Sequence, residues 1–221
     1  MSESSSRKIV SAGGYDAAVE WLRKWGWLVA LIAAAAATIG DLGQLWTVNA
    51  ARPALGLAAP PKGIVPAATL AGTLGIPLYA VGYYVRAHRA RRKAPKCAAV
   101  VAIAGAALAV VGGSLHAVSG VLIVNNVGGI TGGLDPIAGM LAGGPIVLAL
   151  WAITAAFFVC AAISEACLPQ ARVARLFNPA VLVLLLSAAA SLLPLPLPDF
   201  VGPAALNIAH LLFFARLGLL D

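Results

Sequence analysis

Charged side chains are scarce in this chain of 221 residues. They make up 10% of the sequence, while hydrophobic residues make up 61%; in a soluble domain about 25% of residues are charged. The composition therefore excludes a soluble globular protein and indicates an integral membrane protein. Six apolar segments of roughly 20 residues, the length that crosses a bilayer, use nearly the whole chain. They leave no room for a separate soluble catalytic domain.

The sequence also lacks the motifs of several other protein classes. Its cysteines, Cys97, Cys160 and Cys167, include no Cys-x-x-Cys pair, and we expect them to be reduced because the cytoplasm disfavours disulfides. Its histidines show no His-x-x-x-His or His-Glu-x-x-His spacing. Basic residues do not alternate with aromatic ones as a nucleic-acid groove requires, so no nucleic-acid partner is expected.

Basic residues follow the apolar segments in a regular way. The predicted spans cover about 25–48, 64–86, 98–125, 145–168, 179–193 and 200–219. Of the 15 Lys and Arg residues, 13 lie on one side of these spans, and only Arg52 and Lys62 lie on the other. Basic connections favour the cytoplasmic side. The sequence therefore predicts an all-α bundle of six transmembrane helices with both termini cytoplasmic, in the plasma membrane of a prokaryote.

This topology divides the chain into two parts. Residues 1–24 are predicted to form a cytoplasmic tail and interfacial segment, disordered as far as Gly14, with Trp21 at the level of the lipid headgroups. Residues 25–221 are predicted to form the transmembrane domain. The partners expected for such a domain are membrane lipids and a hydrophobic small molecule, and the oligomeric state cannot be read from the chain.

Polar side chains are rare inside the predicted spans, and most of them fall at one depth. In the first span, Thr38, Asp41 and Gln44 recur every three residues and share a helix face. Asp41 is about seven residues from the outer end, hence roughly 10 Å deep at 1.5 Å per residue. An ionisable residue there is costly and is by default a candidate functional residue. The alternative is a hydrogen-bonded Asp that only holds helices together.

Two further spans carry polar residues in the same layer. In the third span, His116 follows Gly112 by one helical turn, and such small residues allow another helix to approach closely. In the last span, Asn207 and His210 share one continuous face at the depth of Asp41 or slightly deeper. The sequence therefore predicts one polar layer in the outer half of the membrane, built by three helices.

The predicted site follows from this layer. Its catalytic residues are Asp41, His116, Asn207 and His210, and its substrate-binding residues are Gln44, Trp46, Thr73, Tyr79 and Ser119. Residues nearer the cytoplasmic ends are predicted to have structural roles. Glu165 is expected to form an ion pair with Arg92, Arg172 or Arg175. Tyr83 and Tyr84 are expected to belong to the inner aromatic belt.

Two imidazoles and a carboxylate in a water-poor cavity are compatible with three kinds of chemistry. The first is acid–base catalysis, of isomerase, cyclase or hydrolase type, on a hydrophobic lipid or isoprenoid-like substrate, and it needs no cofactor. The second is a zinc site of Asp41, His116 and His210, and the third is a b-type haem between the two histidines. A non-catalytic protein that binds lipid or a partner protein, or a small transporter, is the alternative.

Several short motifs carry a family resemblance over most of the chain. They are Gly40–Asp41, Gly75-x-Pro77-Leu78-Tyr79, Gly112–His116, Phe177–Pro179 and Asn207–Phe214. With them the chain resembles an uncharacterised family of six-helix prokaryotic membrane proteins, which implies the fold but no activity. The polar layer is more loosely similar to sterol-isomerase-like proteins and to zinc hydrolases related to alkaline ceramidases. This chain has no Glu in the outer layer, where the isomerase-like proteins would need one, and it lacks the third intramembrane His of the zinc hydrolases.

Overall fold

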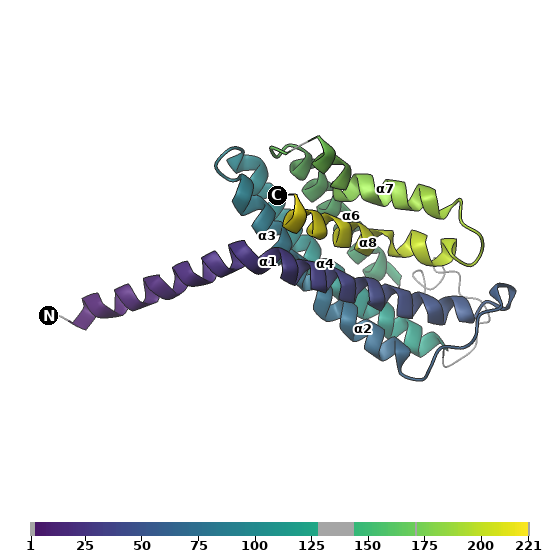
Figure 1. Cartoon of the computed structure of the whole chain (residues 1–221). Coiled ribbons are helices and arrows are strands. Elements are labelled where there is room, and N and C mark those ends of the chain that lie inside the picture. The colour runs from purple at the N-terminus through teal and green to yellow at the C-terminus, as the bar shows by residue number, and fades with distance from the viewer. Residues whose placement is uncertain (1–2, 128–143, 171, 221) are drawn as a thin grey trace.

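The chain folds as a bundle of membrane-spanning helices (Figure 1). The computed structural model describes residues 3–127, 144–170 and 172–220, and every regular element within these ranges is a helix. Five helical stretches are long and apolar enough to cross a membrane: Asp16–Ala50, Ile64–Ala90, Pro95–Ile123, Pro145–Ala166 and Pro198–Leu219. The prediction of an all-α, multi-pass membrane fold is confirmed.

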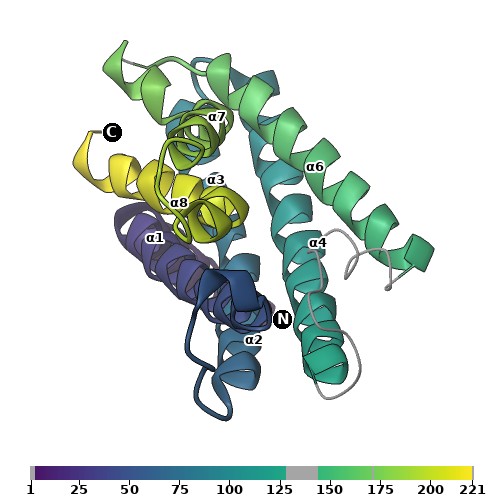
Figure 2. The ribbon, with the colours of Figure 1, turned by 90° about the vertical axis from the view of Figure 1, so that its right-hand side faces the viewer.

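The helices run along the bundle in both directions, with α2 and α3 forming one continuous stretch (Figure 1). In chain order they are α1 (Glu3–Ala50), α2 (Ile64–Gly75), α3 (Tyr79–Ala90), α4 (Pro95–Val127), α6 (Gly144–Ala166), α7 (Pro179–Ala190) and α8 (Pro198–Leu219). Short 3₁₀ turns occur at η1 (Pro53–Leu55), η2 (Ile76–Leu78) and η3 (Val173–Phe177). Helix α8 packs against α1 and α7, whereas α6 packs mainly against α4 (Figure 2).

Both ends of the bundle can be recognised from the chain's turns. The C-terminus, the turn between α3 and α4 and the η3 turn lie at one end (Figure 1), which we call the basic end because most Lys and Arg residues fall there in the sequence. The turns after α1 and α7 lie at the opposite end.

Helix α1 is longer than predicted. It begins at Glu3 and continues without a break to Ala50, so the prediction of a disordered tail up to Gly14 is wrong, and no break marks the predicted boundary after residue 24. The reason is that the first proline of the chain, Pro53, comes only after the helix ends. Its 48 residues correspond to about 72 Å, and its N-terminal part protrudes beyond the bundle at the basic end (Figure 1).

The second span is a helix in two parts. Helices α2 and α3 are joined by η2, where Pro77 lacks the N–H that an α-helical hydrogen bond needs. The chain keeps its direction, so the two parts form one apolar stretch of 27 residues. A Cβ on Gly113 of α4 would lie 2.9 Å from Cγ of Pro77, and α4 therefore approaches closely beside Tyr79.

The fifth predicted span is shorter than expected. Helix α7 has 12 residues, or about 18 Å, whereas the prediction extended it to residue 193. Asn178 caps its start by accepting a hydrogen bond from the backbone N–H of Ala180 at 3.0 Å. The helix ends before three prolines, Pro194, Pro196 and Pro198, which have no N–H to donate.

The turn after α7 continues the apolar surface. Leu192 and Leu195 are largely exposed there, and the prolines remove backbone donors that a lipid environment could not satisfy. The backbone N–H groups of Leu192 and Leu193 donate to carbonyl oxygens in the last turn of α7, and that of Leu197 donates to Pro194. The fifth predicted span is therefore a short helix followed by an apolar turn.

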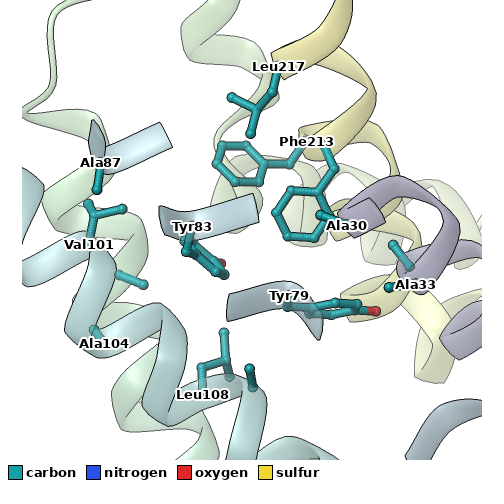
Figure 3. Packing of buried hydrophobic residues seen from close by; sticks show 14 of the residues in the cluster. Ala30, Ala33, Tyr79, Tyr83, Ala87, Val101, Ala104, Leu108, Phe213 and Leu217 are labelled. Atoms are coloured by element: carbon teal, nitrogen blue, oxygen red, sulfur yellow. The ribbon is translucent and has the colours of Figure 1, made fainter. Parts of the chain in front are cut away.

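Aromatic rings and small residues fill the centre of the bundle (Figure 3). Tyr79 and Tyr83 of α3 and Phe213 of α8 pack among small residues of α1 and α4. The prediction that Tyr83 belongs to the inner aromatic belt is wrong, because its ring is completely buried and a Cβ on Gly105 would collide with it. Close packing of this kind holds helices together where lipid removes the hydrophobic driving force.

An ion cluster joins three helices at the basic end. Glu165 of α6 is fully buried, and its Oε1 accepts from Arg86 Nε of α3 at 3.2 Å and from Arg216 Nη1 of α8 at 3.0 Å. Its Oε2 accepts from Asn178 at 2.9 Å. The predicted pairing of Glu165 with an arginine of a cytoplasmic turn is therefore wrong. The spans themselves bring two arginines to the depth of Glu165.

Candidate functional site

A cavity of about 390 Å³ lies in the half of the bundle away from the basic end. It is bounded by α1 and α8 on one side and by α4 and α6 on the other, where α6 diverges from α8 (Figure 2). Its lining is mostly apolar and includes Leu108, Leu122, Ile123, Trp151 and Leu206. Its polar lining residues are Asp41, Gln44, Tyr79, His116, Ser119, Thr154, Asn207 and His210.

Asp41 is held from two sides at the wall of this cavity. Its Oδ1 lies 3.2 Å from His116 Nδ1 of α4, and its Oδ2 accepts from Asn207 Nδ2 of α8 at 2.7 Å. The side chain of Asp41 is 19% exposed, compared with 5% for His116. The carboxylate therefore connects three helices and still presents part of its surface to the cavity.

Hydrogen-bond donors converge on Asp41. His116 Nε2 lies 3.1 Å from Gln44 Nε2 and 3.3 Å from the carbonyl oxygen of Ala68, and its Nδ1 faces Asp41. On the other side, the Tyr79 hydroxyl donates to Asn207 Oδ1 at 2.7 Å. Both chains of contacts end at the carboxylate, one at each of its oxygens.

His210 lines the cavity but belongs to a second hydrogen-bonded pair. Its Nδ1 lies 2.8 Å from the carbonyl oxygen of Leu206, which only accepts, so Nδ1 carries the proton and Nε2 accepts from the Tyr83 hydroxyl at 2.8 Å. The ring of His210 stacks on Tyr79 with centroids 4.7 Å apart. Tyr79 thus contacts Asn207 through its hydroxyl and His210 through its ring.

Seven of the nine predicted site residues line this one cavity: Asp41, Gln44, Tyr79, His116, Ser119, Asn207 and His210. The structure does not bring the other two to it. Trp46 donates from Nε1 to the carbonyl of Ala58, in the connection after α1, at 3.0 Å. Thr73 Oγ1 is buried without a hydrogen-bond partner and is not among the lining residues. The catalytic and binding roles of all nine stay predictions.

The sequence reasoning missed three residues that shape the site. Thr69 Oγ1 accepts from Gln44 at 3.1 Å, and a Cβ on Gly72 would lie 2.1 Å from His116 Nε2. Tyr83 is the partner of His210. Their spacing could have indicated them. Thr69 and Gly72 are three residues apart and Tyr83 follows Tyr79 by four, so each pair shares a helix face.

The metal and haem alternatives lack a matching geometry in the described part of the chain. There, no group of three or more His, Cys, Asp and Glu side chains is placed to hold a metal ion. Asp41 and His116 are neighbours, but both ring nitrogens of His210 face protein partners. Both a three-ligand zinc site and a bis-histidine haem would require His210 to give up these partners.

Comparison with known proteins finds no match for this chain among protein-family models, curated proteins or solved structures. The resemblance to an uncharacterised six-helix family stays a prediction. The geometry of the cavity is what indicates a function.

Proposed function

We propose that this protein is a membrane-embedded enzyme that moves a proton on a hydrophobic substrate of lipid or isoprenoid type. The observation that carries the proposal is the Asp41 carboxylate, fixed by His116 and Asn207 and partly open to an apolar cavity. A general acid or base has to be held in position and shielded from bulk water to act on a weakly acidic group. Asp41 meets both conditions.

The simplest reaction of this kind is an isomerisation. Asp41 takes a proton from a carbon next to a double bond or carbonyl group, the double bond shifts, and Asp41 returns the proton to another carbon. One C–H bond breaks and another forms, so no oxidant or cofactor is consumed. His116 and Asn207 position the carboxylate, Ser119 supplies a hydroxyl for a polar group of the substrate, and the stacked rings of Tyr79 and His210 form an apolar wall.

The surroundings of the cavity favour entry from the bilayer. The cavity lies between α8 and α6; α8 packs mainly against α1 and α7, and α6 packs mainly against α4. We place the basic end on the cytoplasmic side of a prokaryotic plasma membrane, since basic connections favour that side, and the cavity then lies in the outer half.

Deuterium incorporation tests the proposal. Purified protein is incubated in D₂O with a lipid extract of prokaryotic membranes, and the lipids are analysed by mass spectrometry. The wild-type protein should add deuterium to one lipid class, where Asp41 exchanges its proton with water between the two transfers, or convert that class to an isomer of the same mass with a new chromatographic retention. Asp41→Asn should do neither, because an amide cannot accept and return the proton.

Ser114→Ala is a matched control. Ser114 is exposed, lies on α4 two residues before His116 and donates to its own helix at Val110, so this variant should label the same lipid as the wild type. If no lipid gains deuterium or changes its chromatographic retention with the wild-type protein, the enzymatic proposal is wrong.

A non-catalytic lipid-binding protein is the second candidate. It is favoured by the completeness of the polar network, because Asp41 and Asn207 already have partners within the protein. In that case a lipid should co-purify with the wild-type protein, unchanged in mass after incubation in D₂O, and Asp41→Asn should retain it.

A further inference from the structure

Two cysteines from different helices lie against each other at the basic end of the bundle. Cys97 is the third residue of α4, and Cys167 directly follows the last residue of α6. These two helices pack against each other, and a hydrogen bond joins the two thiols. We propose that Cys97 and Cys167 form an oxidation site, at which hydrogen peroxide converts the two thiols into a reversible disulfide. The proposal is independent of any reaction at Asp41.

The packing around the two cysteines holds them together and leaves them accessible. Cys97 packs against the buried core of the bundle, and the residues that follow the two cysteines, Ala98 and Leu168, belong to that core. Both chain segments are therefore fixed beside each other. Cys97 is half-buried, Cys167 is exposed, and both thiols are free. A small, water-soluble oxidant can reach the pair.

The position of Cys97 favours a negative charge on its sulfur. The first hydrogen bond of α4 runs from the N–H of Ala98 to the carbonyl oxygen of Ala94 at 2.9 Å, so Cys97 lies in the first turn, where backbone N–H groups lack intrahelical acceptors. The helix N-terminus carries a partial positive charge, and Lys96 adds a full one. The thiolate is the form that attacks a peroxide. We therefore assign the first reaction step to Cys97.

Cys167 is suited to the second step. Its pKa is raised, chiefly because a negative charge on Cys97 repels a second charge, and further by desolvation and by the hydrogen bond between the two thiols. Cys167 therefore keeps its proton while Cys97 is ionised.

The two steps balance. The Cys97 sulfur attacks the O–O bond, which breaks and leaves a sulfenic acid and one water molecule. The thiol of Cys167 then displaces the hydroxyl group, which leaves with the thiol proton as a second water molecule, and the S–S bond forms. The two cysteines lose two electrons, and the peroxide gains them. A reducing cytoplasm reverses the reaction.

The third cysteine provides a matched control. Cys160 is also exposed, and it lies on α6 seven residues before Cys167, which is about 10 Å along the helix axis. It should keep its thiol while the other two react. The disulfide would join the basic ends of α4 and α6, the two helices that form one side of the Asp41 cavity.

Thiol labelling after oxidation tests the proposal. The full-length protein in detergent is treated with hydrogen peroxide, denatured, labelled with a maleimide and analysed by intact and peptide mass spectrometry. Wild-type protein should lose two of its three reactive thiols and the mass of two hydrogen atoms, with a peptide that links Cys97 to Cys167 within one chain. Dithiothreitol should restore both thiols. Cys160→Ser should form the same link at the wild-type rate.

Single variants separate the two steps. In Cys167→Ser the sulfenic acid of Cys97 has no second thiol beside it, so dimedone should trap it. In Cys97→Ser the remaining thiols should react more slowly than Cys97 does. The proposal is overturned if wild-type protein keeps all three thiols, if the link involves Cys160 or a second chain, or if Cys97 and Cys167 oxidise to sulfinic acids without a link. These outcomes are read from the wild-type protein, so they hold even if a variant does not fold.

Discussion

Asn207 and Asp41 are 166 positions apart in the chain, and a hydrogen bond of 2.7 Å joins their side chains. This contact ties the last helix to the first at the wall of the cavity. Asn207 also accepts from Tyr79, so the amide is oriented from both of its ends. The position of Asp41 therefore depends on residues that do not touch it.

Tyr79→Phe should destabilise the protein by about 1–2 kcal/mol, because Asn207 Oδ1 is left as a buried acceptor without its donor. Denaturant unfolding in detergent micelles measures the loss. Tyr84→Phe is the control, since Tyr84 is exposed and packs against His88, and its effect should stay within about 0.5 kcal/mol. Equal effects of the two variants would contradict the hydrogen-bond network.

Gly72→Ala should displace His116, because the new Cβ would lie 2.1 Å from the ring nitrogen Nε2. We expect a loss of about 1–3 kcal/mol in denaturant unfolding. Gly202→Ala makes the same chemical change where nothing lies within 4 Å, so it should stabilise helix α8 by about 0.5–1 kcal/mol. Destabilisation by both variants would show that crowding at His116 is not the cause.

Glu165→Gln should be among the most destabilising single substitutions, at about 3–5 kcal/mol, because it removes the shared counter-ion of two buried arginines. The matched control is Asp199→Asn, whose ion pair with Arg52 is partly exposed and should contribute about 0–1 kcal/mol. Denaturant titrations of both variants measure the two losses in free energy of unfolding. A loss below about 1 kcal/mol for Glu165→Gln would mean that the cluster does not stabilise the fold.

Reporter insertions should show opposite sides of the membrane for the two ends of the bundle. A reporter placed after Lys93, in the turn between α3 and α4, should read cytoplasmic, and one placed after Lys62, before α2, should read external. Alkaline phosphatase and fluorescent-protein fusions give complementary readouts of the two sides. An external readout at Lys93 would invert the proposed orientation and place the Asp41 cavity in the inner half.

The depth of each polar residue along the bundle was predictable from the sequence because a helix rises by a constant 1.5 Å per residue. That constancy places Asp41, His116 and Asn207 in one layer, and in the structure they form one hydrogen-bonded group. Helix length was less predictable. Helix α1 starts at Glu3 because no residue stops it, whereas α7 ends early because three prolines follow it closely.

The contacts between side chains of different helices were not predictable, because a single sequence does not show which helices pack against each other. Glu165 has arginines in the turns near it in sequence, but it pairs with Arg86 and Arg216 of other spans. His210 was placed with Asp41 by depth, but its rotation about the axis of α8 turns its nitrogens to Leu206 and Tyr83. The polar ring nitrogen of Trp46 donates to the connection after α1 and does not face the cavity.

The short helix α7 gives this protein an uneven hydrophobic thickness. Its 12 residues span about 18 Å and the 33 residues of α4 span about 50 Å, while the hydrocarbon layer is about 30 Å thick. A bilayer adapts to a short crossing by thinning and to a long one by tilt or local thickening. We therefore expect the membrane to be thinnest beside α7 and α8. A lipid approaching the cavity from that side would bring its headgroup nearer to Asp41 than an undeformed leaflet allows.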